Sequence, residues 1–188
     1  MRNAILIHGT CDKDEYFSDK YKSLSNSHWF PWLQKQLQIK GISTQTPEIT
    51  DAYKPVYGTW KKEFERFDVD EDSILVGHSC GGGFLIRWLS ENKVQINKLI
   101  LVAPWLDPDR IKTKDFFEFE IDTNLITRAK EIHLFISSDD DSDIQESVKL
   151  ILQKLPNIQI QQFENKGHFT YGQMNTEKFP ELLEIILK

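Results

Sequence analysis

The chain has 188 residues, of which 39% are hydrophobic and 28% are charged, as is typical of one folded domain with its own core. A formal net charge of −6, without any cluster of Lys and Arg, argues against a nucleic-acid partner. Because no apolar run is long enough for a signal peptide or a membrane span, we expect a cytoplasmic protein with no membrane partner. The two cysteines, Cys11 and Cys80, are then expected to be reduced thiols.

Short apolar runs alternate with longer amphipathic stretches along the whole chain. The runs predict strands at 4–7, 43–46, 73–76, 98–103, 131–136 and 158–163. The amphipathic stretches predict helices at 29–39, 60–67, 82–89, 144–155 and 177–187. Most runs are continuously apolar, as in strands that are buried on both faces of a parallel sheet. The alternation predicts an α/β fold over residues 1–188, a single domain with a doubly wound, mainly parallel sheet of about six strands and helices on both faces.

Two segments interrupt this alternation, and both follow a predicted strand. Residues 11–27 are polar and lack periodicity, and residues 105–122 contain Pro108 and several aromatic side chains. We expect both at the carboxyl edge of the sheet, where ligands bind in such folds. The second segment is too short to form a full lid domain.

The strongest chemical signal is Gly77-His78-Ser79-Cys80-Gly81, which lies between a predicted strand and a predicted helix. This G-x-S-x-G pattern places a serine on a tight strand-to-helix turn, where small neighbours avoid collisions and the helix N-terminus can stabilise an oxyanion. Ser79 is therefore the candidate nucleophile. The alternative is a glycine-rich turn that cradles a phosphate group.

A serine nucleophile needs a base, and His168 is the best candidate because it directly follows the last predicted strand. The other histidines are expected to be structural; they are His8, His28, His78 and His133.

The acidic partner of the base is expected between serine and histidine in chain order, and the run 137–143 follows a predicted strand at the right place. Spacing alone leaves Asp139, Asp140 and Asp141 open. The alternatives for this run are a solvated acidic turn or a cation site, although the pattern of an EF-hand is absent.

An oxyanion hole requires two donors, which we expect from the backbone N–H of Cys80 and that of Thr10 or Cys11. A cysteine nucleophile is disfavoured because Cys80 lies one residue past the turn position. Aromatic side chains are candidates for an apolar acyl pocket, although core packing explains Trp32 equally well. The pocket candidates are Trp29, Trp105, Phe116 and Phe117.

With these residues in hand, the chain resembles the small serine hydrolases of the α/β-hydrolase fold that group the retinoblastoma-binding serine hydrolase of animals with bacterial relatives. The likeness rests on segments along most of the chain, namely Ile5-Leu6-Ile7-His8-Gly9, Ser27-His28-Trp29-Phe30-Pro31-Trp32-Leu33, residues 77–81, Leu99-Ile100-Leu101-Val102, Ser138-Asp139-Asp140 and Gly167-His168-Phe169. It implies little or no lid, and it assigns the catalytic acid to Asp140, the second Asp of the pair. Two departures are a longer loop at 11–25 and Asp141-Ser142-Asp143-Ile144, where the family has an apolar residue and Pro.

These observations lead to the hypothesis of a serine hydrolase that cleaves a small ester, with an amide or thioester as alternative substrates, through Ser79, His168 and Asp140 and an acyl-enzyme. The expected partner is a small acyl substrate, and no metal or organic cofactor is needed. The second hypothesis is a binding or regulatory protein that keeps the fold but has little or no turnover. Oligomeric state and the physiological substrate do not follow from the sequence.

Overall fold

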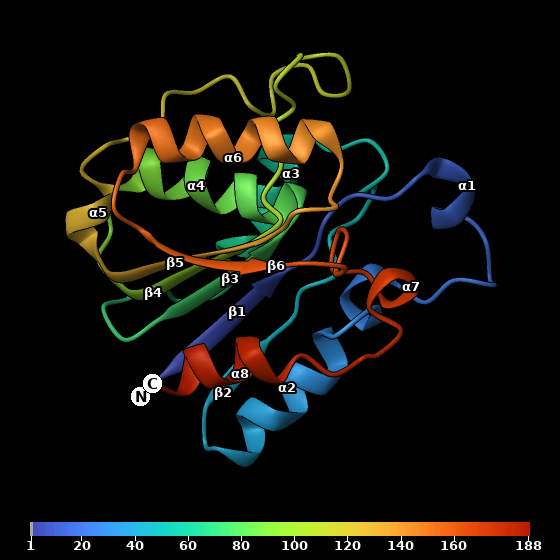
Figure 1. Cartoon of the computed structure of the whole chain (residues 1–188), viewed down its shortest axis with the longest axis horizontal. Coiled ribbons are helices and arrows are strands. Elements are labelled where there is room, and N and C mark those ends of the chain that lie inside the picture. The colour runs from blue at the N-terminus through green and yellow to red at the C-terminus, as the bar shows by residue number, and fades with distance from the viewer. Residues whose placement is uncertain (1) are drawn as a thin grey trace.

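The computed structural model of the protein describes residues 2–188 and contains a six-stranded sheet (Figure 1). Its strands are β1 (Asn3–Ile7), β2 (Ser43–Gln45), β3 (Ile74–His78), β4 (Ile96–Val102), β5 (Ala129–Ser137) and β6 (Gln159–Phe163). All neighbouring strands pair in parallel in the order β2-β1-β3-β4-β5-β6. The predicted fold class is confirmed, with each strand within a few residues of its expected place.

Helices cover both faces of the sheet (Figure 1). On one face lie α3 (Tyr57–Phe64), α4 (Cys80–Asn92) and α6 (Ser142–Lys154), and on the other lie α2 (Phe30–Ile39) and α8 (Pro180–Leu187). The sequence did not predict four short helices, because their apolar periodicity is too brief to recognise. These are α1 (Lys13–Tyr16), η1 (Leu24–Asn26), α5 (Leu125–Arg128) and α7 (Tyr171–Met174).

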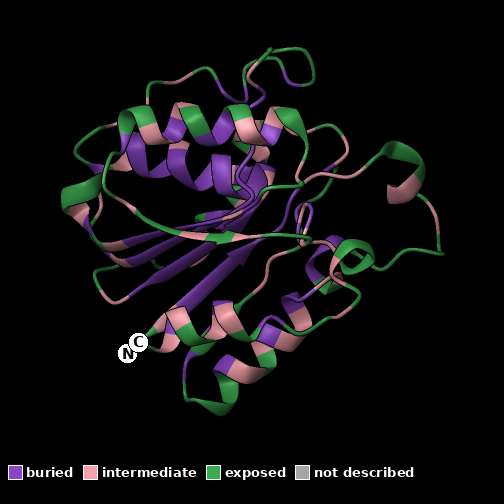
Figure 2. Ribbon diagram, viewed as in Figure 1, coloured by how far each residue is buried: buried purple, intermediate pink, exposed green. Residues whose placement is uncertain are grey.

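The core is centred on β3 and α4. Every residue of β3 is buried, and α4 is buried along almost its whole length (Figure 2). The edge strand β6 is mostly exposed or half-buried, which agrees with its polar sequence Gln-Ile-Gln-Gln-Phe. Within residues 2–188, no helix has both the length and the apolar character that crossing a membrane requires.

The chain order reverses between β1 and β3, so that the loops after these strands diverge at the carboxyl edge of the sheet. The loop after β1 begins at His8, and the turn after β3 begins at Ser79. The two segments approach each other closely at Gly81, where an added Cβ would lie 2.3 Å from the carbonyl oxygen of Ile7 and 2.5 Å from that of His8. The absence of a side chain at Gly81 therefore lets α4 begin directly against the end of β1.

We expect Gly81→Ala to lower the free energy of unfolding by about 1–3 kcal/mol, because the methyl group would collide with fixed backbone atoms. Gly58→Ala is the matched control, since Gly58 lies in α3 with no atom near its added Cβ. The control should be unchanged or more stable by up to about 1 kcal/mol. Urea unfolding of both variants measures the difference, and equal stabilities would contradict the close approach at Gly81.

Candidate active site

Ser79 occupies a strained backbone conformation between β3 and α4, with φ 54° and ψ −125°. Its N–H donates to the carbonyl of Val102 on β4 at 2.9 Å, and its carbonyl accepts from the N–H of Gly82 at 2.9 Å and of Trp105 at 3.0 Å. These bonds hold a left-handed φ that costs a non-glycine residue energy. The turn therefore has the geometry that the G-x-S-x-G pattern predicts.

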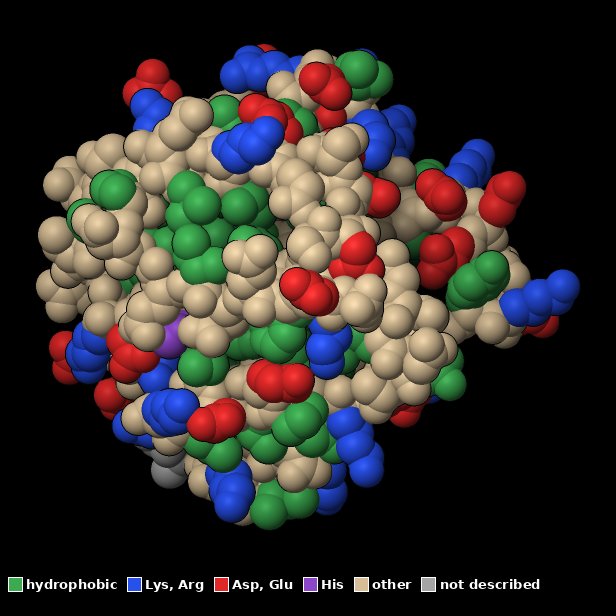
Figure 3. Space-filling model, viewed as in Figure 1, with side chains coloured by type: hydrophobic (Ala, Val, Ile, Leu, Met, Phe, Trp, Pro, Cys, Tyr) green, Lys and Arg blue, Asp and Glu red, His purple; other side chains and the backbone are tan. Residues whose placement is uncertain are grey.

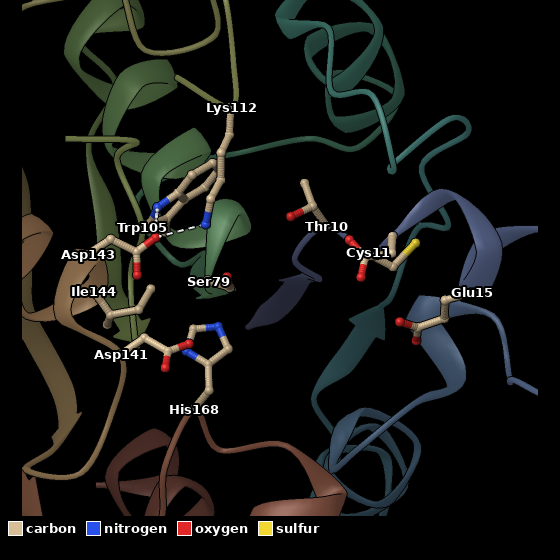
Figure 4. A pocket seen from close by; sticks show the side chains of 11 residues that line it. Thr10, Cys11, Glu15, Ser79, Trp105, Lys112, Asp141, Asp143, Ile144 and His168 are labelled. Carbon is tan, nitrogen blue, oxygen red and sulfur yellow. Dashed lines mark hydrogen bonds and ion pairs between the residues drawn. The ribbon is translucent and has the colours of Figure 1, made fainter. Parts of the chain in front are cut away.

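The His168 ring is bound to Asp140. Its Nδ1 lies 3.0 Å and 3.2 Å from the two carboxylate oxygens, and the Asp140 side chain is only 1% exposed. With Nδ1 donating to a buried carboxylate, Nε2 is the nitrogen left to accept a proton. Ser79 and His168 line the same cavity, in which Figure 4 shows the imidazole beside the serine.

The neighbouring aspartates have different contacts, so the structure distinguishes among the three candidates. Asp139 accepts hydrogen bonds from the Ser137 hydroxyl and from the N–H of Gly167 at 3.1 Å, which lower its pKa and join the loop after β5 to the loop that carries His168. Asp141 occupies the N-cap position of α6 without a side-chain hydrogen bond to the helix, and its side chain lines the cavity. Only Asp140 contacts the His168 ring among these three. Within residues 2–188, no group of three or more His, Cys, Asp or Glu side chains is arranged to hold a metal ion.

Two further side chains fix the backbone of His168. Nε2 of His78 donates to the His168 carbonyl at 2.7 Å, and the Gln173 side-chain oxygen accepts from the His168 N–H at 2.7 Å. Burial lowers the pKa of His78 well below its ordinary value, so this imidazole stays neutral. His78 therefore orients the loop that carries the base, a role that its position before Ser79 did not reveal.

The remaining histidines also hold the fold in place. Nδ1 of His28 accepts from the N–H of Tyr171 at 3.1 Å, and burial followed by repulsion from His168 lowers the pKa of His28 to about 4. His8 bonds the Gly9 carbonyl through Nδ1 and accepts from the N–H of Ile49 through Nε2. His133 lies on β5, where its Nε2 contacts Glu131.

The expected oxyanion donors surround Ser79. Cys80 is the first residue of α4, where a helix leaves its N–H groups without partners inside the helix. The loop after β1 approaches from the other side, and an added Cβ on Gly9 would lie 2.9 Å from Cβ of Ser79. Thr10 and Cys11 follow in this loop and line the cavity.

Neither cysteine has the features of a nucleophile. Both thiols are free, as expected for reduced cysteines. Burial raises the pKa of Cys80 well above its ordinary value, and burial together with nearby carboxylates raises the pKa of Cys11 to about 11. Since the thiolate is the reactive form, both thiols are unreactive at neutral pH.

Two cavities adjoin Ser79, and three residues line both of them: Thr10, Ser79 and His168. The outer cavity has a volume of about 340 Å³, and its further lining includes Glu15, Trp105, Lys112, Asp141 and Asp143 (Figure 4). The inner cavity has a volume of about 60 Å³ and is more enclosed; its further lining includes Leu24, His28, Phe30 and Thr170.

Of the four aromatic side chains that we expected in the pocket, only Trp105 lines a cavity at Ser79. Trp29 is fully buried and stacks on Phe30, with 4.2 Å between the ring centroids. Phe116 and Phe117 pack in the core against α3 and α4, because the 105–122 segment folds back over these helices. The expected apolar acyl pocket of Trp29, Phe116 and Phe117 is therefore replaced by core packing.

Lys112 and Asp143 also line the outer cavity; Asp143 belongs to the acidic run after β5, whereas Lys112 was not a candidate. The Lys112 ammonium and the Trp105 indole N–H both contact the Asp143 carboxylate, at 3.0 Å and 3.1 Å (Figure 4). The loop of Lys112 is closed by the buried Asp107, whose carboxylate accepts the N–H groups of residues 111–113. Only the fold brings Lys112 into the cavity of Ser79, because no periodic pattern or motif marks it.

The sequence profile of the serine hydrolase family matches residues 19–185. The chain belongs to this family. It is 24% identical over 163 residues to YdeN of Bacillus subtilis, a protein whose name describes it as a hydrolase, and the match covers 84% of this chain and 86% of YdeN. The likeness to the retinoblastoma-binding member from animals stays a prediction.

The crystal structure of the B. subtilis ydeN product superposes with a TM-score of 0.79 at 22% identity, covering all of this chain and 97% of that one. Est1E from Butyrivibrio proteoclasticus, solved with ferulic acid, gives a TM-score of 0.64 at 15% identity and covers 100% and 90% of the two chains. The Arabidopsis methylesterase MES16 gives 0.65 at 13% identity and covers 100% and 99%. These structures establish a shared fold for this serine hydrolase.

The contacts of the three aspartates predict different effects on hydrolysis. Asp140→Asn should lower kcat by about 10⁴-fold, because the amide stabilises the wrong tautomer of His168 and cannot balance an imidazolium. Asp139→Asn keeps an oxygen that can accept from the Ser137 hydroxyl and the Gly167 N–H. It should therefore lower kcat by less than about 10-fold. Asp141→Asn is the second control. Initial rates on p-nitrophenyl acetate test the order, and an active Asp140→Asn variant would remove Asp140 from the mechanism.

His28 should make stability depend on pH in a defined window. Its pKa is about 4 in the folded protein and 6.5 when unperturbed, so the unfolded chain binds more protons between these values. The free energy of unfolding should therefore fall as the pH drops from about 6.5 toward 4, by up to about 1.4 kcal/mol per pH unit for this proton. Urea unfolding of wild type and His28→Gln at pH 7, 6 and 5 should show a smaller fall in the variant. The lowered pKa values of His8 and His78 act in both proteins, so equal pH dependence would exclude a contribution from His28.

Proposed function

We propose that this serine hydrolase cleaves small carboxylic esters through an acyl-enzyme formed on Ser79. The observation that carries the proposal is the bond between Nδ1 of His168 and the buried Asp140, in a cavity that also exposes Ser79 on its strained turn. This arrangement supplies a nucleophile, a base and a group that orients the base. Amides and thioesters, which react by the same steps, are the alternative substrates.

In the first half-reaction, Oγ of Ser79 bonds to the carbonyl carbon of the ester while its proton passes to Nε2 of His168. Asp140 stabilises the resulting imidazolium through Nδ1. The N–H of Cys80 and that of Thr10 or Cys11 donate to the oxyanion. The bond from carbon to the alcohol oxygen then breaks, and the alcohol leaves with the proton from His168.

In the second half-reaction, water attacks the acyl-enzyme while His168 accepts one of its protons. The bond between the carbonyl carbon and Oγ of Ser79 breaks, and His168 returns the proton to the serine. The products are one carboxylic acid and one alcohol, and the enzyme regains its starting state. No step requires a metal ion or an organic cofactor, so a small acyl substrate is the one partner that the proposal names.

The second hypothesis, a binding protein without turnover, predicts a site in which at least one of these contacts is lost. His168 keeps its bond to Asp140 and lines a cavity together with Ser79, and Asp139, His78 and Gln173 further hold the loop of the base. Such an arrangement favours catalysis, because a fold kept only for binding has no need to position a base. The proposal includes a cytoplasmic location, because a chain with only two cysteines does not depend on disulfides for its stability.

Ser79→Ala should lower the hydrolysis of p-nitrophenyl acetate by at least about 10³-fold, because the acyl-enzyme cannot form. A fluorophosphonate probe should label the wild-type protein covalently and leave the variant unlabelled, as intact mass spectrometry would show. Ser138→Ala is the matched control, because Ser138 is exposed and makes only a backbone hydrogen bond to Phe163. A folded wild-type protein with neither turnover nor labelling would support the binding hypothesis.

A further inference from the structure

The two cavities at Ser79 differ in size and in openness, and an ester likewise has two unlike halves, an acyl group and an alcohol. Each is lined by Thr10, Ser79 and His168, so a carbonyl group at the nucleophile has one substituent directed into each cavity. The inner cavity is small and the less open of the two, whereas the outer cavity is several times larger and opens widely to solvent. The geometry therefore separates the acyl group from the alcohol.

The order of the chemical steps decides which half occupies which cavity. The alcohol must leave, and water must enter, while the acyl group is still bonded to Ser79. Because the inner cavity is the less open of the two, an alcohol held there would leave, and water would enter, less readily than through the outer cavity. The acyl group therefore belongs in the inner cavity and the alcohol in the outer one.

The volume of the inner cavity limits the acyl group. An engineered protein cavity of about 150 Å³ binds benzene, with its six carbon atoms, whereas about 10–15 Å³ is enough for one water molecule. The inner cavity, at about 60 Å³, has room for a group well below the size of benzene. Leu24 and Phe30 supply buried apolar walls. The other walls include Thr170 and three imidazoles whose pKa values are lowered by burial and which are therefore uncharged, those of His8, His28 and His78. An uncharged chain of one or two carbon atoms beyond the carbonyl fits this space.

The lining of the outer cavity constrains the alcohol. Asp12, Glu15 and Asp141 have no ion pair within residues 2–188, whereas Lys112 is paired with Asp143. The excess negative charge acts on neighbouring groups, since Asp12 adds to the effect of burial in raising the pKa of Glu15. On the face shown in Figure 3, basic and acidic side chains are interspersed, without a broad patch of either sign. An anionic alcohol would therefore be repelled from the cavity.

We infer that the substrates are acetyl- or propionyl-sized esters of alcohols that carry no negative charge, with the acyl group between Leu24 and Phe30. The inference rests on the proposed function and assigns specificity-determining roles to Leu24 and to the carboxylates of the outer cavity. It names both halves of the substrate by size and charge.

The acyl half is tested with p-nitrophenyl acetate, propionate, butyrate, hexanoate and octanoate. For the wild-type protein, kcat/KM should fall by at least about 10-fold from acetate to hexanoate, because methylenes that do not fit a pocket are rejected by such factors. Leu24→Ala enlarges the inner cavity and should raise the hexanoate-to-acetate ratio of kcat/KM by about 10-fold. Leu125→Ala, in the short helix α5 away from both cavities, is the matched control and should leave the ratio unchanged.

Leu24→Phe provides the opposite change, and it keeps the test valid if the alanine variant does not fold. The larger ring should fill the inner cavity and lower kcat/KM for propionate more than for acetate. The assignment of the acyl group would be overturned if the wild-type protein hydrolysed all chain lengths equally. It would also be overturned if both Leu24 variants kept the chain-length preference of the wild type. In both of these outcomes the protein still cleaves esters through Ser79. If the proposed function itself failed, no ester would be cleaved and no fluorophosphonate probe would react.

The alcohol half is tested with acetyl thioesters of thiocholine, 2-mercaptoethanol and 2-mercaptoethanesulfonate, which differ in charge and share the acetyl group. At low ionic strength, kcat/KM for the anionic thioester should be about 10-fold below that for the neutral one, and the gap should close in 0.5 M salt, as charge repulsion is screened. Glu15→Gln should narrow the gap, because it removes one of the unpaired charges. Equal rates for anionic and neutral thioesters at low salt would overturn this half of the inference.

Discussion

The strained backbone of Ser79 is the constraint on which the site depends. A φ of 54° is unfavourable for serine, and the structure keeps it because backbone hydrogen bonds tie the residue to β4, to the first turn of α4 and to Trp105. Gly81 lets the same turn contact the end of β1, so that the nucleophile lies between two loops that diverge at the reversal of strand order. This position exposes the hydroxyl to the cavities while the residues around it stay buried.

Two neutral imidazoles, those of His78 and His28, hold the loop of His168, the imidazole that takes up a proton in the proposed reaction. The His78 ring donates to the carbonyl of His168, and the His28 ring accepts from the N–H of Tyr171 in the same loop. Burial keeps both uncharged, so they place no fixed positive charge beside His168 when it takes up a proton. Asp140 then supplies the one carboxylate bound to the ring, while Asp139 bonds only the backbone and hydroxyl groups that place the loop.

The sequence predicted the strands, the main helices and the turn of Ser79, because each depends on local periodicity or on a short motif with a steric reason. It could not choose among the three aspartates by spacing, since the choice depends on how the loop after β6 meets the loop after β5. The residues that line the cavities were harder to predict from the sequence. Phe116 and Phe117 looked like pocket residues by composition, but the segment that carries them folds back over α3 and α4. The cavity walls come instead from Leu24 and Lys112, which no pattern distinguishes from ordinary loop residues.

The parallel sheet has a consequence for how the site is assembled over time. Ser79 lies in the first half of the chain, whereas its base follows β6, the last strand to be synthesised and an edge strand of the sheet. Loop closure over such sequence separations is slow, and parallel pairings form only after distant segments meet. The nucleophile turn can form long before His168 is available to activate it. A growing chain of this protein would thus contain the serine turn before it contains the base that activates the serine. The pairing of β6 with β5 is the folding event that brings the base to its place.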